Sequence, residues 1–133
     1  MILVDTTVWV DYFNGRITPE TATLDKLLST DEIIIGDIIF VEVLQGFRID
    51  HDFDTALQAL MRFRQVSMLN PNLAVRCARN YRQLRKSGST IRKTVDCIIA
   101  TYCIENHIEL LHCDRDFDPF EQYLGLQVVQ QSL

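Results

Sequence analysis

Short apolar runs alternate with longer stretches of mixed apolar and polar residues along most of the chain. The runs are rich in isoleucine, leucine and valine, which is typical of short strands buried in a parallel sheet. The longer stretches repeat apolar residues every three or four positions, which favours helices. Five runs are predicted to be strands, at residues 2–4, 32–36, 66–69, 109–112 and 127–129. Strands that alternate with helices predict an α/β fold with a mainly parallel sheet.

Capping residues indicate where several predicted helices begin. Thr18 before Pro19 and Asn70 before Pro71 are typical helix starts, because the side chain caps a free backbone N–H and proline fits the first turn. Asp37 is expected to cap an apolar helix over residues 38–47. Further helices are predicted after Asp5, over 53–63 and over 94–107, and a loop over 114–118. Because no linker or repeat interrupts this order, residues 1–133 are predicted to form a single domain.

The charges are distributed unevenly along the chain. Although the formal net charge is −5, residues 55–95 hold nine basic and no acidic residues, so this segment carries +9 and the rest −14. Three of the basic residues recur at every third position on one predicted helix, off its apolar stripe. Clustered basic residues are typical of phosphate-binding surfaces, although a solvated helix face is an alternative interpretation. The candidate RNA-binding residues are Arg76, Arg79, Arg82, Arg92 and Lys93.

Cysteine usage and hydropathy limit the cellular compartment. The four cysteines, at positions 77, 97, 103 and 113, form no C-x-x-C pair, so a zinc site is poorly supported. Free thiols favour the reducing cytoplasm. No apolar run approaches the roughly 18 residues of a membrane span, so no membrane contact is expected. The N-terminus lacks the basic region of a secretion signal.

Five carboxylates occupy positions that suggest a ligand site. Asp5 follows the first predicted strand, and Asp114 and Asp116 follow the fourth, where open α/β sheets bind ligands. Glu42 lies inside an otherwise apolar helix with no basic residue one turn away, which is costly unless it is paired or binds a cation. Asp96 lies in the first turn of another apolar helix, where capping is an alternative role. If these acids meet, an oxygen-only set suits Mg²⁺ or Mn²⁺.

The segments around these acids resemble, in order, the acidic motifs of PIN domains. They are Val4-Asp5-Thr6-Thr7, Val41-Glu42-Val43-Leu44, Val95-Asp96-Cys97-Ile98-Ile99-Ala100 and Asp114-Arg115-Asp116-Phe117. The similarity covers essentially the whole chain and is closest to the VapC toxins of prokaryotic toxin–antitoxin pairs. It implies a PIN-like three-layer α/β/α sandwich with a mainly parallel sheet.

The resemblance also implies an activity and a site. The expected catalytic and metal-binding residues are Asp5, Glu42, Asp96 and Asp114, with Asp116 as a further metal ligand. Thr7 is expected to support the first acid or a water. His112 stands where many relatives have Thr or Ser. The implied activity is a Mg²⁺-dependent endoribonuclease, with Mn²⁺ as a substitute, that hydrolyses RNA to 5′-phosphate and 3′-hydroxyl ends.

The partners implied by the resemblance are an RNA substrate, a cognate VapB-type antitoxin and a second copy of the chain, with DNA contacted only through the antitoxin. Two alternatives stay open within the PIN superfamily. One is a DNA nuclease, because metal-assisted hydrolysis does not need the 2′-hydroxyl. The other is a catalytically inactive PIN-like binding module, although retention of costly carboxylates disfavours it.

Two other functional classes are disfavoured by the sequence. A phosphoacceptor receiver domain needs an aspartate after its central strand and a late lysine, whereas Asn70 follows the run at 66–69 and no lysine follows Lys93. Metal-free cyclisation of RNA uses a pair of imidazoles. The three histidines, His51, His107 and His112, occur in separate predicted elements and form no recognisable pair.

Overall fold

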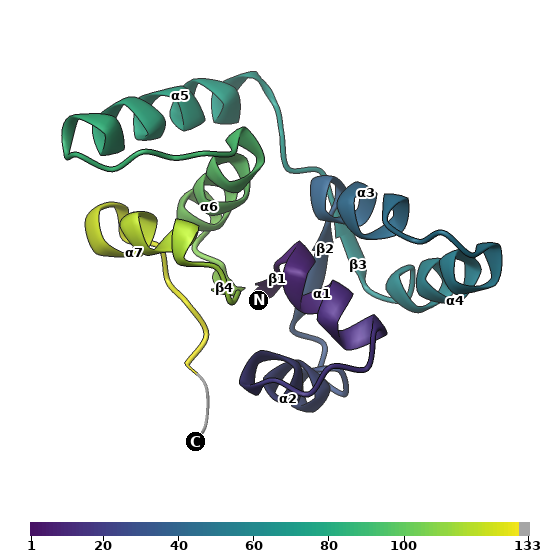
Figure 1. Cartoon of the computed structure of the whole chain (residues 1–133). Coiled ribbons are helices and arrows are strands. Elements are labelled where there is room, and N and C mark those ends of the chain that lie inside the picture. Colours follow the sequence, from purple (N-terminus) through teal and green to yellow (C-terminus); the bar gives the residue numbers. More distant parts are fainter. Residues whose placement is uncertain (131–133) are drawn as a thin grey trace.

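Four short strands form one parallel sheet in the computed structural model, which describes residues 1–130 (Figure 1). They are β1 (Ile2–Val4), β2 (Ile33–Gly36), β3 (Arg64–Val66) and β4 (Glu109–Leu111), in the order β3-β2-β1-β4. In the register, Leu3 of β1 pairs with Ile34 on one side and with Leu110 on the other. All three side chains are buried, so their apolar run forms the centre of the core.

Helices cover both faces of this sheet (Figure 1). One layer holds α1 (Thr6–Phe13), α2 (Pro19–Leu27), α3 (Asp37–Gln45) and α4 (Asp50–Leu60). The other holds α5 (Pro71–Lys86), α6 (Thr94–Asn106) and α7 (Asp118–Leu124), with the short 3₁₀ helix η1 (Arg115–Phe117) before α7. The predicted three-layer α/β/α sandwich with a parallel sheet is therefore confirmed.

The strand order creates a switch point beside β1. The chain proceeds outward from β1 to β2 and β3, and then returns across the sheet to β4 on the other side of β1. Connections before and after this reversal run over opposite faces, as the two helix layers show (Figure 1). In open α/β sheets, ligands bind at such a point, beyond the carboxyl ends of the strands. The ends of β1 and β4 are therefore where a site is expected.

Two predicted helix starts are confirmed by their caps. The Thr18 hydroxyl accepts a hydrogen bond from the Thr21 N–H at 3.0 Å, and the Asn70 side chain accepts one from the Leu73 N–H at 2.9 Å. On α5, the apolar stripe faces inward, with Leu73 and Leu84 buried. None of the helices formed by residues 1–130 combines the length and apolarity of a membrane span.

The third strand and the role of Asp37 were predicted wrongly. β3 covers Arg64–Val66 instead of 66–69, because the Met68 N–H donates to the Asp37 carboxylate at 3.1 Å and not to a neighbouring strand. The same Asp37 oxygen accepts from the Ile38 N–H at 2.8 Å. Asp37 is therefore the first residue of α3, and Gly36 occupies the cap position. The Asp37 carboxylate holds the segment after β3 through its hydrogen bond with the Met68 N–H.

The C-terminal region differs from the prediction in two ways. The expected fifth strand at 127–129 contributes only one isolated parallel bridge, between Val128 and Leu110, so the sheet described has four strands. The expected loop at 114–118 instead contains η1 and leads directly into α7. Asp118 and Pro119 start α7, and Phe120 anchors it in the core.

Candidate metal centre

Asp5 and Asp114 lie at the carboxyl ends of neighbouring strands. Asp5 follows β1, and its N–H donates to the carbonyl of Leu111, the last residue of β4, at 2.9 Å. Asp114 follows β4 and caps η1, where its carboxylate accepts from the Asp116 N–H at 2.9 Å. The parallel pairing of β1 with β4 thus brings two acids that are distant in sequence to the switch point of the sheet.

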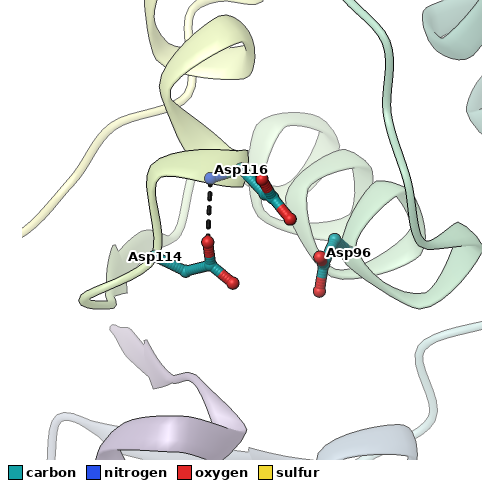
Figure 2. A group of neighbouring side chains, drawn as sticks. All are labelled: Asp96, Asp114 and Asp116. Carbon is teal, nitrogen blue, oxygen red and sulfur yellow. Dashed lines mark hydrogen bonds between the residues drawn. The ribbon is translucent and has the colours of Figure 1, made fainter.

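Three aspartates form a tight cluster at this edge (Figure 2). One carboxylate oxygen each from Asp96, Asp114 and Asp116 lies within 4.8 Å of the others. Asp96 projects from the first turn of α6, whereas Asp114 and Asp116 come from the turn after β4 (Figure 2). Like charges at such separations repel, so the cluster needs protons or a cation to offset its charge.

The buried carboxylates carry the electrostatic signature of this crowding. The pKa of Asp5 is raised to about 7, mainly by burial and further by Asp96, Glu42 and Asp114, against a lowering by its hydrogen bond with the Thr6 backbone. The pKa of Asp96 is raised to about 6, again mainly by burial, then by Asp114, while Lys93 partly offsets the shift. Asp5, Glu42, Asp96 and Asp114 therefore interact as one group.

Glu42 completes the group from α3. It is half-buried, and one of its carboxylate oxygens accepts a hydrogen bond from the Thr6 hydroxyl at 2.7 Å. This bond joins the first turn of α1 to α3. Among residues 1–130, no lysine or arginine forms an ion pair with Glu42, Asp5 or Asp96. The sequence-based expectation that Glu42 lacks a basic partner thus agrees with the geometry.

Thr6, and not Thr7, contacts an acid of the group. Thr7 is exposed, and its side chain makes no hydrogen bond within the part of the chain that is described. The sequence could not distinguish the two threonines, because both follow Asp5 and both lie in the first turn of α1. Only the packing of α1 against α3 selects the hydroxyl that faces Glu42.

The Asp96 carboxylate has the surroundings expected of a cation ligand. Its Oδ2 atom is buried and, among the described residues, has no hydrogen-bond partner. Burying such an oxygen without a partner costs on the order of 1–3 kcal/mol or more for a charged group. The three possible ligand atoms of the cluster are all carboxylate oxygens, which hard divalent cations prefer. The residues present therefore fit a divalent metal ion.

His112 was not predicted as a site residue, but it supports the acidic turn. Its Nδ1 atom accepts from the Asp114 N–H at 3.1 Å, and its ring lies against Phe117 with centroids 4.8 Å apart. Burial lowers the pKa of His112, which favours the neutral imidazole that this acceptor role requires. An imidazole nitrogen thus supports the backbone at the start of the acidic turn.

The basic residues fall into two groups at different distances from the acids. Arg92 forms an ion pair with Asp116 at 3.1 Å, and Lys93 acts directly on Asp96. Arg76 instead pairs with Glu105 at 3.5 Å, in the last turn of α6. With a rise of about 1.5 Å per residue, that turn lies about 14 Å along α6 from Asp96.

Arg79 and Arg82 lie between these two positions. Arg79 lines a cavity with Glu105, near the end of α6, whereas Arg82 lines one with Thr94 and Ile98, near its start. Both arginines are exposed. The predicted row therefore follows α6 from its far end toward the acids.

Comparison with known proteins agrees with this geometry. The sequence model of the PIN domain matches residues 2–121. The chain is 32% identical over 130 residues to VapC ribonuclease Mb1587 of Mycobacterium bovis, and equally to ribonuclease VapC11 of Mycobacterium tuberculosis, covering 96% of each protein and of this chain.

Solved structures show the same fold. VapBC2 from Rickettsia felis, bound to a promoter DNA fragment, contains a chain that matches with a TM-score of 0.77 at 18% identity, covering 99% of this chain and 100% of that one. FitAcB from Neisseria gonorrhoeae matches with a TM-score of 0.73 at 20% identity, covering 98% and 97%. With four acids of the family's motifs gathered at the switch point, the chain belongs to the PIN-domain family, in its VapC ribonuclease group.

Proposed function

We propose that this protein is a Mg²⁺-dependent endoribonuclease that acts as the toxin of a toxin–antitoxin pair. The observation that carries the proposal is the buried Asp96 carboxylate, which has an unpartnered oxygen beside Asp114 and Asp116 and near Asp5. A catalytically inactive binding module would not need this costly arrangement. The ribonuclease activity named for the relatives at 32% identity supports the same substrate class.

Asp5 and Asp96 would hold the cation directly, with Glu42 and Asp114 completing the site partly through waters and Asp116 as a further acid. The bound ion would supply positive charge to the scissile phosphate and lower the pKa of a water. The Thr6 hydroxyl fixes one Glu42 oxygen and leaves the other for the site. His112 orients the backbone of Asp114. Manganese has the same preference for oxygen ligands and would substitute.

Replacing Thr6 with Val is expected to weaken divalent-cation binding about 10- to 100-fold, because Val keeps the shape but removes the hydrogen bond to Glu42. Thr7→Val is the matched control, since Thr7 is exposed and adjacent. The Mg²⁺ concentration needed for half of the maximal rise in Tm measures the effect. A larger change in Thr7→Val than in Thr6→Val would indicate that Thr7, as first expected, supports the first acid or a water.

RNA would approach over α5 and the segment that joins α5 to α6. Lys93 and Arg92, beside the acids, would bind phosphates near the scissile bond, and Arg82, Arg79 and Arg76 would bind more distant ones. Because Arg76 is engaged by Glu105, it contributes less than the exposed Arg79 and Arg82.

Replacing Arg76, Arg79 and Arg82 with Ala is expected to weaken RNA binding and to flatten its dependence on salt, since each lost phosphate contact reduces the salt slope by about 1. Arg62→Ala is the control, because Arg62 lines a cavity with Ile33 at the amino end of β2, whereas the acids lie at the carboxyl ends of the strands. Binding of a labelled RNA across a salt series measures the slope. An unchanged slope in the triple variant would show that these three arginines form only a solvated helix face.

A direct cleavage assay tests whether the protein prefers RNA to DNA as its substrate. Single-stranded RNA and DNA of one sequence are incubated with excess protein and Mg²⁺, and the RNA is expected to be cleaved much faster. Equal or faster cleavage of the DNA would favour a DNA nuclease of the same superfamily. No cleavage of either strand, with Mg²⁺ binding intact, would favour an inactive binding module.

The proposed partners are a VapB-type antitoxin and a second copy of this chain in a homodimer. The Rickettsia felis complex supports the first, since its name pairs VapB with VapC on promoter DNA. DNA would then be contacted only through the antitoxin. We further propose that residues 1–133 act as a single PIN domain in the cytoplasm, a compartment in which free cysteines are common.

A further inference from the structure

Two cysteines face each other across the packed helices α5 and α6. Cys77 lies on α5 and Cys97 on α6, and both thiols are free and buried. The Cys97 thiol donates to the backbone carbonyl of Cys77 at 3.3 Å, and the Cys77 thiol donates to that of Cys97 at 3.8 Å. Each side chain therefore reaches the main chain of the other cysteine.

This reciprocal contact places the two cysteines close to each other, as a disulfide requires. A disulfide requires Cα atoms roughly 4.4–6.8 Å apart and Cβ atoms about 3.5–4.5 Å apart. A thiol within hydrogen-bond distance of the opposite carbonyl brings the two backbones within about one side-chain length. We expect a rotation of the two side chains to bring the sulfur atoms into bonding distance.

The pair also borders a route from solvent. Both cysteines line a surface cavity of about 520 Å³ between α5 and α6. Arg82 and Arg85 line the same cavity, and both are exposed. Their guanidinium groups favour anionic compounds. A small disulfide that carries carboxylates therefore has both the room and the charge to approach Cys77.

We propose that Cys77 and Cys97 form a redox pair that is converted to an intramolecular disulfide by small anionic disulfides. The Cys77 thiolate attacks one sulfur of the reagent, breaks its S–S bond and releases one thiol. The Cys97 thiol then loses its proton, and its sulfur attacks the Cys77 sulfur of the mixed disulfide, which releases the second thiol. The two cysteines are oxidised, the reagent is reduced to two thiols, and these take up the two protons.

The bond would fix α5 against the first two turns of α6. It would close the chain between residues 77 and 97, a loop that includes Arg92 and Lys93. Closing a loop of about 20 residues restricts the unfolded chain and should raise the Tm by on the order of 10 °C. The inference does not depend on the proposed nuclease activity, because its measurements need neither RNA nor metal.

The test compares the full-length protein after incubation with oxidised or reduced glutathione. We expect the oxidised protein to lose two hydrogens in its intact mass, to yield a linked peptide pair that contains Cys77 and Cys97, and to melt at the higher temperature. Reduction with dithiothreitol should reverse all three changes.

Variants separate this pair from the other thiols. Cys77→Ala should abolish the linked peptides and the rise in Tm, whereas Cys103→Ala, at another buried position of α6, and Cys113→Ser, at the exposed thiol, should retain both. Should Cys77→Ala fail to fold, peptide mapping of the wild type still decides. Glutathione attached only at Cys113, a linked pair that includes Cys103, or an oxidised protein with an unchanged Tm would overturn the proposal.

Discussion

The Asp96→Asn protein is expected to lose RNA cleavage by orders of magnitude, while its metal-free form is at least as stable as the metal-free wild type. Asn keeps the shape of the side chain but removes a charge that Asp114, Asp116 and Glu42 oppose. Removing that charge relieves repulsion in the absence of metal. It also removes a ligand oxygen, so the variant should gain much less stability from Mg²⁺ than the wild type gains by mass action.

Thermal melts in EDTA and in Mg²⁺, beside a cleavage assay, measure both effects. Asp54→Asn is a suitable control, because Asp54 is an exposed carboxylate on α4, outside the acidic group. If Asp96 only stabilises the start of α6, Asn substitutes nearly as well and activity persists. A variant that keeps the Mg²⁺-dependent rise in Tm and cleaves at the wild-type rate would remove Asp96 from the site.

The stability of the protein is expected to change with pH in opposite directions without and with Mg²⁺. In the metal-free fold, the pKa values of Asp5 and Asp96 are raised to about 7 and about 6, first of all by burial. A raised carboxyl pKa stabilises the fold while the group is protonated, and this stability is lost as pH rises through the folded-state pKa. Asp5 and Asp96 together should therefore lower the metal-free free energy of unfolding by about 1 kcal/mol between about pH 6.5 and pH 8. The lowered pKa of the Cys77 thiol adds stability with the opposite sign in this range, so the two slopes are compared in the Cys77→Ala background.

Mg²⁺ should reverse this slope, because the cation binds ionised carboxylates and its binding releases protons. Denaturant unfolding in EDTA and in saturating Mg²⁺ measures the two slopes. At lower pH, the lowered pKa of His112 makes the stability rise with pH, which opposes the effect of the two aspartates. The range above about pH 6.5 is therefore decisive. Metal-free stability that rises across that range would contradict the description of Asp5 as a crowded, buried carboxyl.

Local patterns were sufficient for most of the fold. The apolar runs predicted β1, β2 and β4, and the caps at Thr18 and Asn70 predicted the starts of α2 and α5. The errors came from tertiary contacts. The Met68 N–H donates to the Asp37 carboxylate instead of to a neighbouring strand, so β3 ends earlier than predicted. No periodicity in the sequence reveals this long-range bond. The start of α7, Asp118 before Pro119, lies at the end of the segment that was predicted as a loop.

The candidate site was predictable as a set of acids but not as a geometry. Asp5 and Asp114 could be assigned to a site because both follow predicted strands. The parallel pairing of β1 with β4 makes the carboxyl ends of these strands neighbours. The partners that orient the acids depend on helix packing and on the path of a turn. Thr6 reaches Glu42 only because α1 packs on α3, and His112 supports Asp114 only through the turn after β4.

The most direct measurement is the cleavage of an end-labelled single-stranded RNA by the purified protein in EDTA, and again after Mg²⁺ is added in excess of the chelator. If the acidic group acts through a divalent cation, there is no cleavage in EDTA, activity returns with Mg²⁺ or Mn²⁺, and the products carry 5′-phosphate and 3′-hydroxyl ends. Full cleavage in EDTA, with products that end in 2′,3′-cyclic phosphates, would contradict the metal-dependent mechanism.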